Sequence, residues 1–318
     1  MLSLLSLVAF TPAHLGSGDD VQPRDTVSVI ESVVPALPAT VRVSIVGGDT
    51  FLRIESDGVP VEVHGYDDEQ YLRISAAGRV EVNVNSTTSV LNRDRYGNVG
   101  DGDVTGPKDT VRWVTIADDG IAMWHDHRIH WMSPTTPRTV DEQGTVQEWA
   151  VPLVVDGRRV LVSGRLFLRD RASFAWWLVA LLAAVAAWWS SRMRRTRLLV
   201  VPFVSMVGAI VGWMQWSGLP SGARVTPLLL GFCTGAFVLG VLALIMRRNA
   251  NVATSVNAGG AAALVVVAWM NLDQVRAAYV PGIDAEWIAR ITIQLLLGTG
   301  LAACADGIVR IVRDQPAA

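Results

Sequence analysis

The chain has 318 residues, of which 51% are hydrophobic, and its formal net charge is −2 at pH 7. Residues 16–171 carry 24 acidic and 16 basic side chains, whereas residues 172–318 carry 5 acidic and 11 basic ones. Neither part has the basic, aromatic-rich face that phosphate binding requires, which excludes a nucleic-acid-binding protein. Both cysteines, Cys233 and Cys304, lie in apolar segments, so residues 21–172 can form no internal disulfide.

Residues 1–20 begin with a short apolar run, which is followed by Thr11-Pro12-Ala13 and a stretch rich in Gly, Ser and Asp. The run is too short to cross a bilayer. Its length is typical of the apolar region of a secretory signal peptide, although the usual preceding basic residues are missing. We therefore predict a signal peptide over 1–20, with an uncleaved anchor or a misassigned start codon as alternatives.

Residues 21–172 are predicted to form an extracytoplasmic, immunoglobulin-like β-sandwich. The apolar runs 149–155 and 160–168 flank Asp156-Gly157, a dipeptide typical of a two-residue β-hairpin. Further alternating segments lie at 41–45, 51–54, 61–64, 71–74 and 80–84. Seven or more short strands over about 130 residues favour a sandwich. The Gly-, Asp- and Arg-rich segment 92–109 is predicted to be a long loop.

Three of the five histidines lie within one tract, Trp124-His125-Asp126-His127-Arg128-Ile129-His130-Trp131-Met132. His14 falls in the predicted signal peptide, so His64 is the only other histidine of the predicted mature protein. In a strand, His125 and His127 would share a face. His130 could join them only if the chain bends around Arg128-Ile129.

The tract predicts a metal site with His125, His127 and His130 as ligands. Imidazole suits Cu(II) and zinc, and the thioethers of Met123 and Met132 would favour Cu(I), so copper is expected first and zinc second. Asp126 is expected to pair with Arg128.

Two other roles for the tract remain open. The first is a polar interface in which Trp124, Arg128 and Trp131 dock an envelope protein, because Trp and Arg are common at interfaces. The second is a response to pH. His64 is expected to be structural unless the fold brings it near 125–130.

Residues 173–318 are predicted to form a transmembrane domain that contacts the lipid bilayer through five helices. The expected spans lie at 174–190, 198–216, 226–246, 252–270 and 288–309. Paired tryptophans bracket the first span, as in interfacial aromatic belts. Asp306 is the only acid within a span and is expected to pair with Arg310.

Eight arginines fall on one side of the predicted membrane: Arg192, Arg194, Arg195, Arg197, Arg247, Arg248, Arg310 and Arg313. Within residues 173–318, the other side holds only Arg224, Arg276 and Arg290. The positive-inside rule then predicts a multi-pass plasma-membrane protein with a cytoplasmic C-terminus and an extracytoplasmic β-domain.

The tract, with a set of further motifs, resembles a group of uncharacterised actinobacterial multi-pass membrane proteins over most of the chain. Those motifs are Gly65-Tyr66, Tyr71-Leu72-Arg73-Ile74, Trp149-Ala150-Val151-Pro152, Asp156-Gly157 and Gly164. Lys108 is the only lysine among 27 basic residues, and the other 26 are arginines. This preference for arginine indicates the codon bias of a GC-rich genome, such as that of an actinobacterium.

An exported β-domain followed by membrane helices also resembles copper-handling proteins that join a CopC-like domain to a CopD-like membrane part. The hairpin and the following Val162-Ser163-Gly164 are similar to the end of a CopC-like domain. However, CopC-like domains place a ligand histidine at the mature N-terminus, and His14 lies in or beside the predicted cleavage region. CopD-like parts carry intramembrane histidines, and residues 173–318 have none.

These observations favour a binding role, in which the β-domain holds a metal for storage, sensing or delivery in the envelope. A non-metal scaffold is the alternative. An enzyme comes third, because the sequence shows no nucleophile with a base, no phosphate loop and no carboxylate pair.

Overall fold

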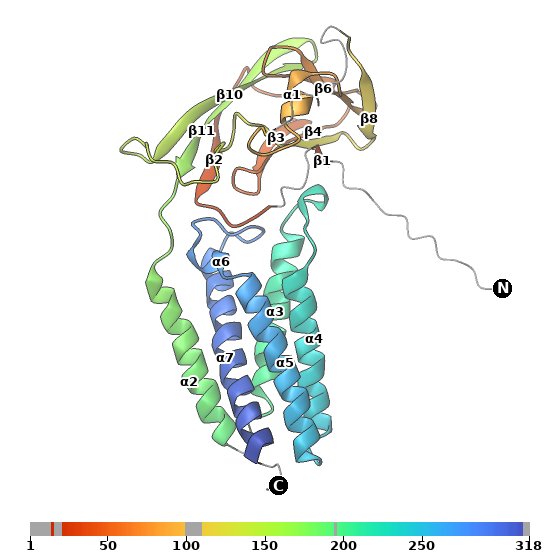
Figure 1. Cartoon of the computed structure of the whole chain (residues 1–318). Helices are drawn as coiled ribbons and strands as arrows, with labels where there is room; N and C mark the ends of the chain where they lie inside the picture. Colours follow the sequence, from red (N-terminus) through yellow and green to blue (C-terminus); the bar gives the residue numbers. More distant parts are fainter. Residues whose placement is uncertain (1–13, 16–20, 99–109, 194–195, 314–318) are drawn as a thin grey trace, which may run out of the picture. The chain divides into compact units, whose positions relative to one another are not determined.

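The computed structural model describes residues 14–15, 21–98, 110–193 and 196–313, and the chain divides into two compact units (Figure 1). The β unit contains Thr26–Leu168, and the helical unit contains Arg169–Leu219 and the chain from Arg224 onward. The predicted signal peptide lies outside the described residues except for His14–Leu15, which form strand β1.

The β unit consists of two sheets. The first has the order β1 (His14–Leu15), β9 (Ile121–Trp124), β4 (Phe51–Ser56), β3 (Val41–Val46). The second has the order β2 (Thr26–Val34), β11 (Arg158–Leu168), β10 (Thr145–Val155), β5 (Val61–His64), β6 (Gln70–Ile74), β7 (Val80–Asn83), β8 (Trp113–Ala117). Neighbouring strands are antiparallel, except that β1 runs parallel to β9. A short helix, α1 (Thr87–Leu91), follows β7.

The predicted hairpin between the two longest strands is confirmed. Val155 of β10 pairs with Arg158 of β11, which leaves Asp156-Gly157 as the two-residue turn. Both turn residues have positive φ, 48° and 73°. Such a pair defines a type I′ turn, and it is why Gly is favoured there.

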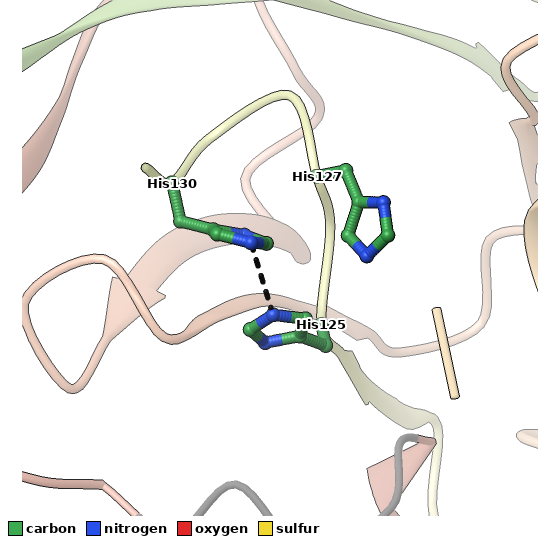
Figure 2. A group of neighbouring side chains, drawn as sticks. All are labelled: His125, His127 and His130. Atoms are coloured by element: carbon green, nitrogen blue, oxygen red, sulfur yellow. Dashed lines mark hydrogen bonds between the residues drawn. The ribbon is translucent and has the colours of Figure 1, made fainter. Parts of the chain in front are cut away.

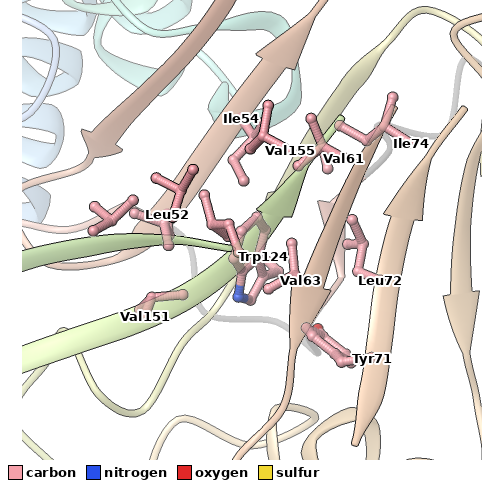
Figure 3. Close-up of a cluster of buried hydrophobic side chains, with 14 of the residues drawn as sticks. Leu52, Ile54, Val61, Val63, Tyr71, Leu72, Ile74, Trp124, Val151 and Val155 are labelled. Atoms are coloured by element: carbon pink, nitrogen blue, oxygen red, sulfur yellow. The ribbon is translucent and has the colours of Figure 1, made fainter. Parts of the chain in front are cut away.

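One hydrophobic core draws on both sheets (Figure 3). Leu52 and Ile54 of β4 and Trp124 of β9 are fully buried with residues of the seven-stranded sheet such as Val61 and Leu72. In β4 and β5 the buried side chains alternate with less buried ones along much of each strand, as expected for a half-buried strand.

In the β unit, four strands and one helix were not expected from the sequence: β1, β2, β8, β9 and α1. The histidine tract is not a strand and instead has the bend around Arg128-Ile129 that His130 needs in order to join the other two histidines. β9 ends at Trp124, and residues 125–130 form a turn. In the predicted loop 92–109, residues 92–98 are turns, and 99–109 lie outside the described residues.

All five predicted apolar segments are helices long and apolar enough to cross a membrane. They are α2 (Trp177–Arg192, extended by the 3-10 turn η1, Phe174–Trp176), α3 (Val200–Ser217), α4 (Leu228–Ile245), α5 (Ala250–Met270) and α7 (Glu286–Arg313). Shorter elements are η2 (Ser221–Ala223) and α6 (Asp273–Arg276). The expected pair within α7 is present, since Arg310 Nε donates to Asp306 Oδ2 at 2.7 Å.

Candidate metal centre

The histidines project from a turn that one carboxylate organises. Asp126 is fully buried, and its carboxylate accepts hydrogen bonds from Trp124 Nε1 at 2.9 Å and from the Arg128 amide at 3.0 Å. It also accepts from Nε and Nη2 of Arg128 at 2.8 and 2.7 Å, the pair predicted from the sequence. The Ile129 amide donates to the Asp126 carbonyl at 3.1 Å and closes the turn. Trp124 and Ile129, both with no exposed surface, anchor its two ends in the core.

This turn brings together the rings of His125, His127 and His130, beneath the arch of the backbone (Figure 2). Each ring offers a nitrogen within 4.8 Å of the others. The Nε2 atoms of His125 and His130 lie 3.3 Å apart. Two nitrogens bound to one tetrahedral ion at about 2.0–2.1 Å are separated by about 3.3–3.4 Å. The pair therefore already has the spacing of two ligands on one metal ion.

Backbone carbonyls orient all three rings. His125 Nδ1 lies 2.7 Å from the Thr50 oxygen, His127 Nε2 2.9 Å from the Asp94 oxygen, and His130 Nδ1 2.9 Å from the Asp126 oxygen. Metal-binding histidines commonly donate the N–H that faces away from the metal in this way.

The ring of His130 faces three hydrogen-bond acceptors, but in its neutral form it has only one N–H to donate. Its Nε2 lies 2.7 Å from the Arg95 carbonyl oxygen and 3.3 Å from His125 Nε2, while its Nδ1 faces the Asp126 oxygen. A neutral imidazole carries a single N–H. Burial lowers the pKa of His130 to about 4, so a second proton is disfavoured near neutral pH. A cation between the two Nε2 atoms would relieve this crowding of lone pairs.

The electrostatics keep all three rings neutral, which is the form that binds metal. Burial is the main cause of the lowered pKa of His125, of His127 and of His130. The positive charge of Arg95 lowers each of these pKa values further.

The cluster lies below the surface. His125 is 2% exposed and His130 is fully buried, whereas His127 is half-buried. The Tyr66 ring stacks on His127 with centroids 5.8 Å apart, and the Tyr66 hydroxyl accepts from the His127 amide at 2.8 Å. His127 is thus the most exposed of the three rings.

The other predicted site residues are dispersed around the turn. Met132 is 38% exposed, and both its methyl group and the His127 ring lie against Gly97. Met123 is buried in β9. Of the residues predicted as an interface, Trp124 is buried in the core and has no surface to offer a partner.

Trp131 is partly exposed, and its indole N–H donates to the Thr135 carbonyl at 2.5 Å. The fold brings the backbone of His64 beside the turn, where its carbonyl accepts from Arg128 at 3.3 Å. The His64 ring is not in the cluster and pairs with Asp68 at 2.8 Å.

The residues that support the rings were not predicted from the sequence. Thr50, Asp94 and Arg95 contribute backbone carbonyls, which any residue type can supply. Arg95 also forms a buried ion pair with Asp49, with Nη2 and Oδ1 2.9 Å apart. Segment 92–109 is rich in Gly, Asp and Arg, and nothing in its sequence distinguishes Arg95 from Arg93 as the partner of Asp49.

Comparisons of this chain with protein-family models, with curated proteins and with solved structures found no match. The resemblances described above therefore stay expectations, and the case for a function rests on the geometry of the histidine cluster.

Proposed function

We propose that the β unit binds one transition-metal ion through His125, His127 and His130. The observation that carries the proposal is the convergence of three neutral imidazoles, two of them at the spacing of tetrahedral ligands. The carbonyls of Thr50, Asp94 and Asp126 support the same conclusion, because each orients a ring through the nitrogen that would not bind the metal.

Copper is the favoured metal and zinc the second. A 3.3 Å separation of ligand nitrogens suits a tetrahedral ion, such as Cu(I) or Zn(II), better than a square-planar one, for which adjacent nitrogens lie about 2.8–2.9 Å apart. Met132 beside His127 places a thioether near the cluster, and thioethers select Cu(I). Met123 is a further candidate sulfur ligand from the preceding strand.

We also infer that this chain is a multi-pass plasma-membrane protein. Five long apolar helices support insertion into a bilayer, and the arginine distribution supports a cytoplasmic C-terminus. The shared core of the two sheets supports an immunoglobulin-like sandwich on the extracytoplasmic side. The metal would then be held outside the cytoplasm.

Holding, sensing or delivering the ion fits these residues better than pumping it. The helical unit contains no histidine, so a metal bound in the β unit has no imidazole path across the bilayer. Docking of an envelope protein through the tract is less well supported, because Trp124 is buried and the Arg128 guanidinium is bound to Asp126.

The test uses the full-length protein, purified in detergent and stripped of metal, and titrated with Cu(I), Cu(II) and Zn(II). Wild type should bind one equivalent, and the double variant His125→Ala/His127→Ala should lose this binding. His64→Ala is the matched control, because its ring lies outside the cluster, and it should bind like wild type. Equal binding by wild type and the double variant would overturn the proposal.

A further inference from the structure

The side chain of Arg95 is buried beside the cluster but only partly satisfied. It is 3% exposed, and its Nη2 donates to Asp49 Oδ1 at 2.9 Å. Its Nε and Nη1 are also buried, and they have no hydrogen-bond partner among the described residues. A buried charged donor without a partner is costly, so these N–H groups indicate a missing acceptor.

Arg95 contacts the cluster through its backbone and is linked to it through its side chain. Its carbonyl oxygen is 2.7 Å from His130 Nε2. Its guanidinium holds Asp49, and the next residue, Thr50, holds the His125 ring through its carbonyl. The positive charge of Arg95 also acts electrostatically on all three rings and lowers the pKa of each.

A metal ion in this cluster would receive no negative ligand from the protein. No carboxylate oxygen among the described residues belongs to the cluster. Asp126 is bound by Arg128, and Asp49 by Arg95. The Asp94 carboxylate accepts from the amides of its own loop, Tyr96 and Asn98. Because Arg95 is already paired with Asp49, three neutral imidazoles would leave the charge of a buried metal cation without a counterion, which is unfavourable at low dielectric.

We propose that a small monovalent anion from solution completes the coordination of the metal and accepts hydrogen bonds from Nε and Nη1 of Arg95. This inference rests on the proposed metal site. The anion would bridge the metal and the guanidinium. It would be the fourth ligand of the metal and would also accept the hydrogen bonds of the unpaired Nε and Nη1 donors. Halide, azide and hydroxide have the required charge and size, whereas burial of His125 and His130 disfavours bulky oxyanions.

The test uses the full-length protein loaded with Co(II), which adopts the tetrahedral geometry of zinc and absorbs in the visible region. Azide is titrated in a buffer whose anion is too bulky to coordinate. Wild type should show saturable azide binding with a changed cobalt spectrum. Arg95→Lys keeps a cation for Asp49 but removes the second and third planar donors, and azide should bind it roughly ten- to hundredfold more weakly. Arg73→Lys, which changes an arginine outside the cluster, is the matched control and should keep wild-type azide affinity.

A second measurement needs no variant. Because linkage is reciprocal, saturating azide or chloride should tighten Co(II) binding to wild type by the same factor by which the metal tightens anion binding. Repeating the titration near neutral and at alkaline pH separates a halide site from one filled by hydroxide, since hydroxide would compete at the higher pH. The inference is overturned if azide does not change the spectrum of Co(II)-loaded wild type. It is also overturned if wild type and Arg95→Lys bind azide with equal affinity. Failure of wild type to take up metal at all would instead overturn the proposed function.

Discussion

Asp126→Asn should be among the most damaging single changes in the β unit. The carboxylate is fully buried and accepts four hydrogen bonds, three of them from Arg128. Asparagine has one acceptor oxygen and no charge, so the guanidinium of Arg128, whose side chain is only 18% exposed, would lose its counterion. Removing one partner of a buried ion pair costs about 3–5 kcal/mol. This is a large share of the roughly 5–15 kcal/mol by which domains are stable.

The cost can be measured by hydrogen exchange on the full-length protein in detergent. The slowest amides of β5 and β10 report global unfolding of the β unit, separately from the helices. Asp68→Asn is the control, because Asp68 is 66% exposed in its pair with His64, and an exposed pair contributes less than about 1 kcal/mol. If the two variants lower protection equally, the view that Asp126 organises the turn is wrong.

Three further outcomes are expected. The metal-free β unit should be fully stable above about pH 6.5 and lose at least about 3 kcal/mol as the pH falls to about 4. Burial lowers the pKa of His130 to about 4, so unfolding takes up a proton, and the lowered pKa values of His125 and His127 add to this loss. Exchange rates corrected for their intrinsic pH dependence measure the loss, and equal stability at both ends would contradict it. Gly298→Ala in α7 should lower the melting temperature in detergent, because the new Cβ would lie 2.1 Å from the Ala180 carbonyl oxygen of α2. Gly235→Ala in α4 is the control. Its Cβ would meet nothing within 4 Å, so this variant should be neutral or stabilised by up to about 1 kcal/mol. In a Cys233→Ala/Cys304→Ala background, an impermeant maleimide should label Asp67→Cys in intact cells and Arg248→Cys only after lysis; the reverse pattern would invert the proposed orientation.

The parts of the fold that the sequence predicts are those with strong local signals. The hairpin follows from Asp156-Gly157, whose residues accept positive φ, between two long apolar strands. The five long helices follow from uninterrupted apolar runs that need no distant partner to be recognised. In contrast, β9 is apolar at all four positions and β8 buries none of its five side chains, so neither strand alternates between buried apolar and exposed polar residues.

In the candidate site, too, only the features with a local sequence signal could be predicted. Three histidines in six residues are visible as ligands, but the turn that unites them is not. Strand parity grouped His125 with His127, whereas the closest pair is His125 and His130. The turn depends on a side chain, Asp126, that binds the residues on either side of it, and on Arg128 reaching the His64 carbonyl. Such side-chain to backbone contacts compete with a strand and leave no periodic pattern.

The separations along the chain explain how metal binding and folding should be coupled. All three ligands come from one turn, yet their orienting carbonyls lie 75, 33 and 4 residues away, in Thr50, Asp94 and Asp126. An unfolded chain could gather the three histidines but not fix their rings, so the native state should bind the metal far more tightly. A ligand at a hundred times its dissociation constant stabilises the state that binds it by about 2.7 kcal/mol. That gain is close to the roughly 3 kcal/mol that protonation of His130 would remove, so a loaded β unit should resist acid that destabilises the empty one.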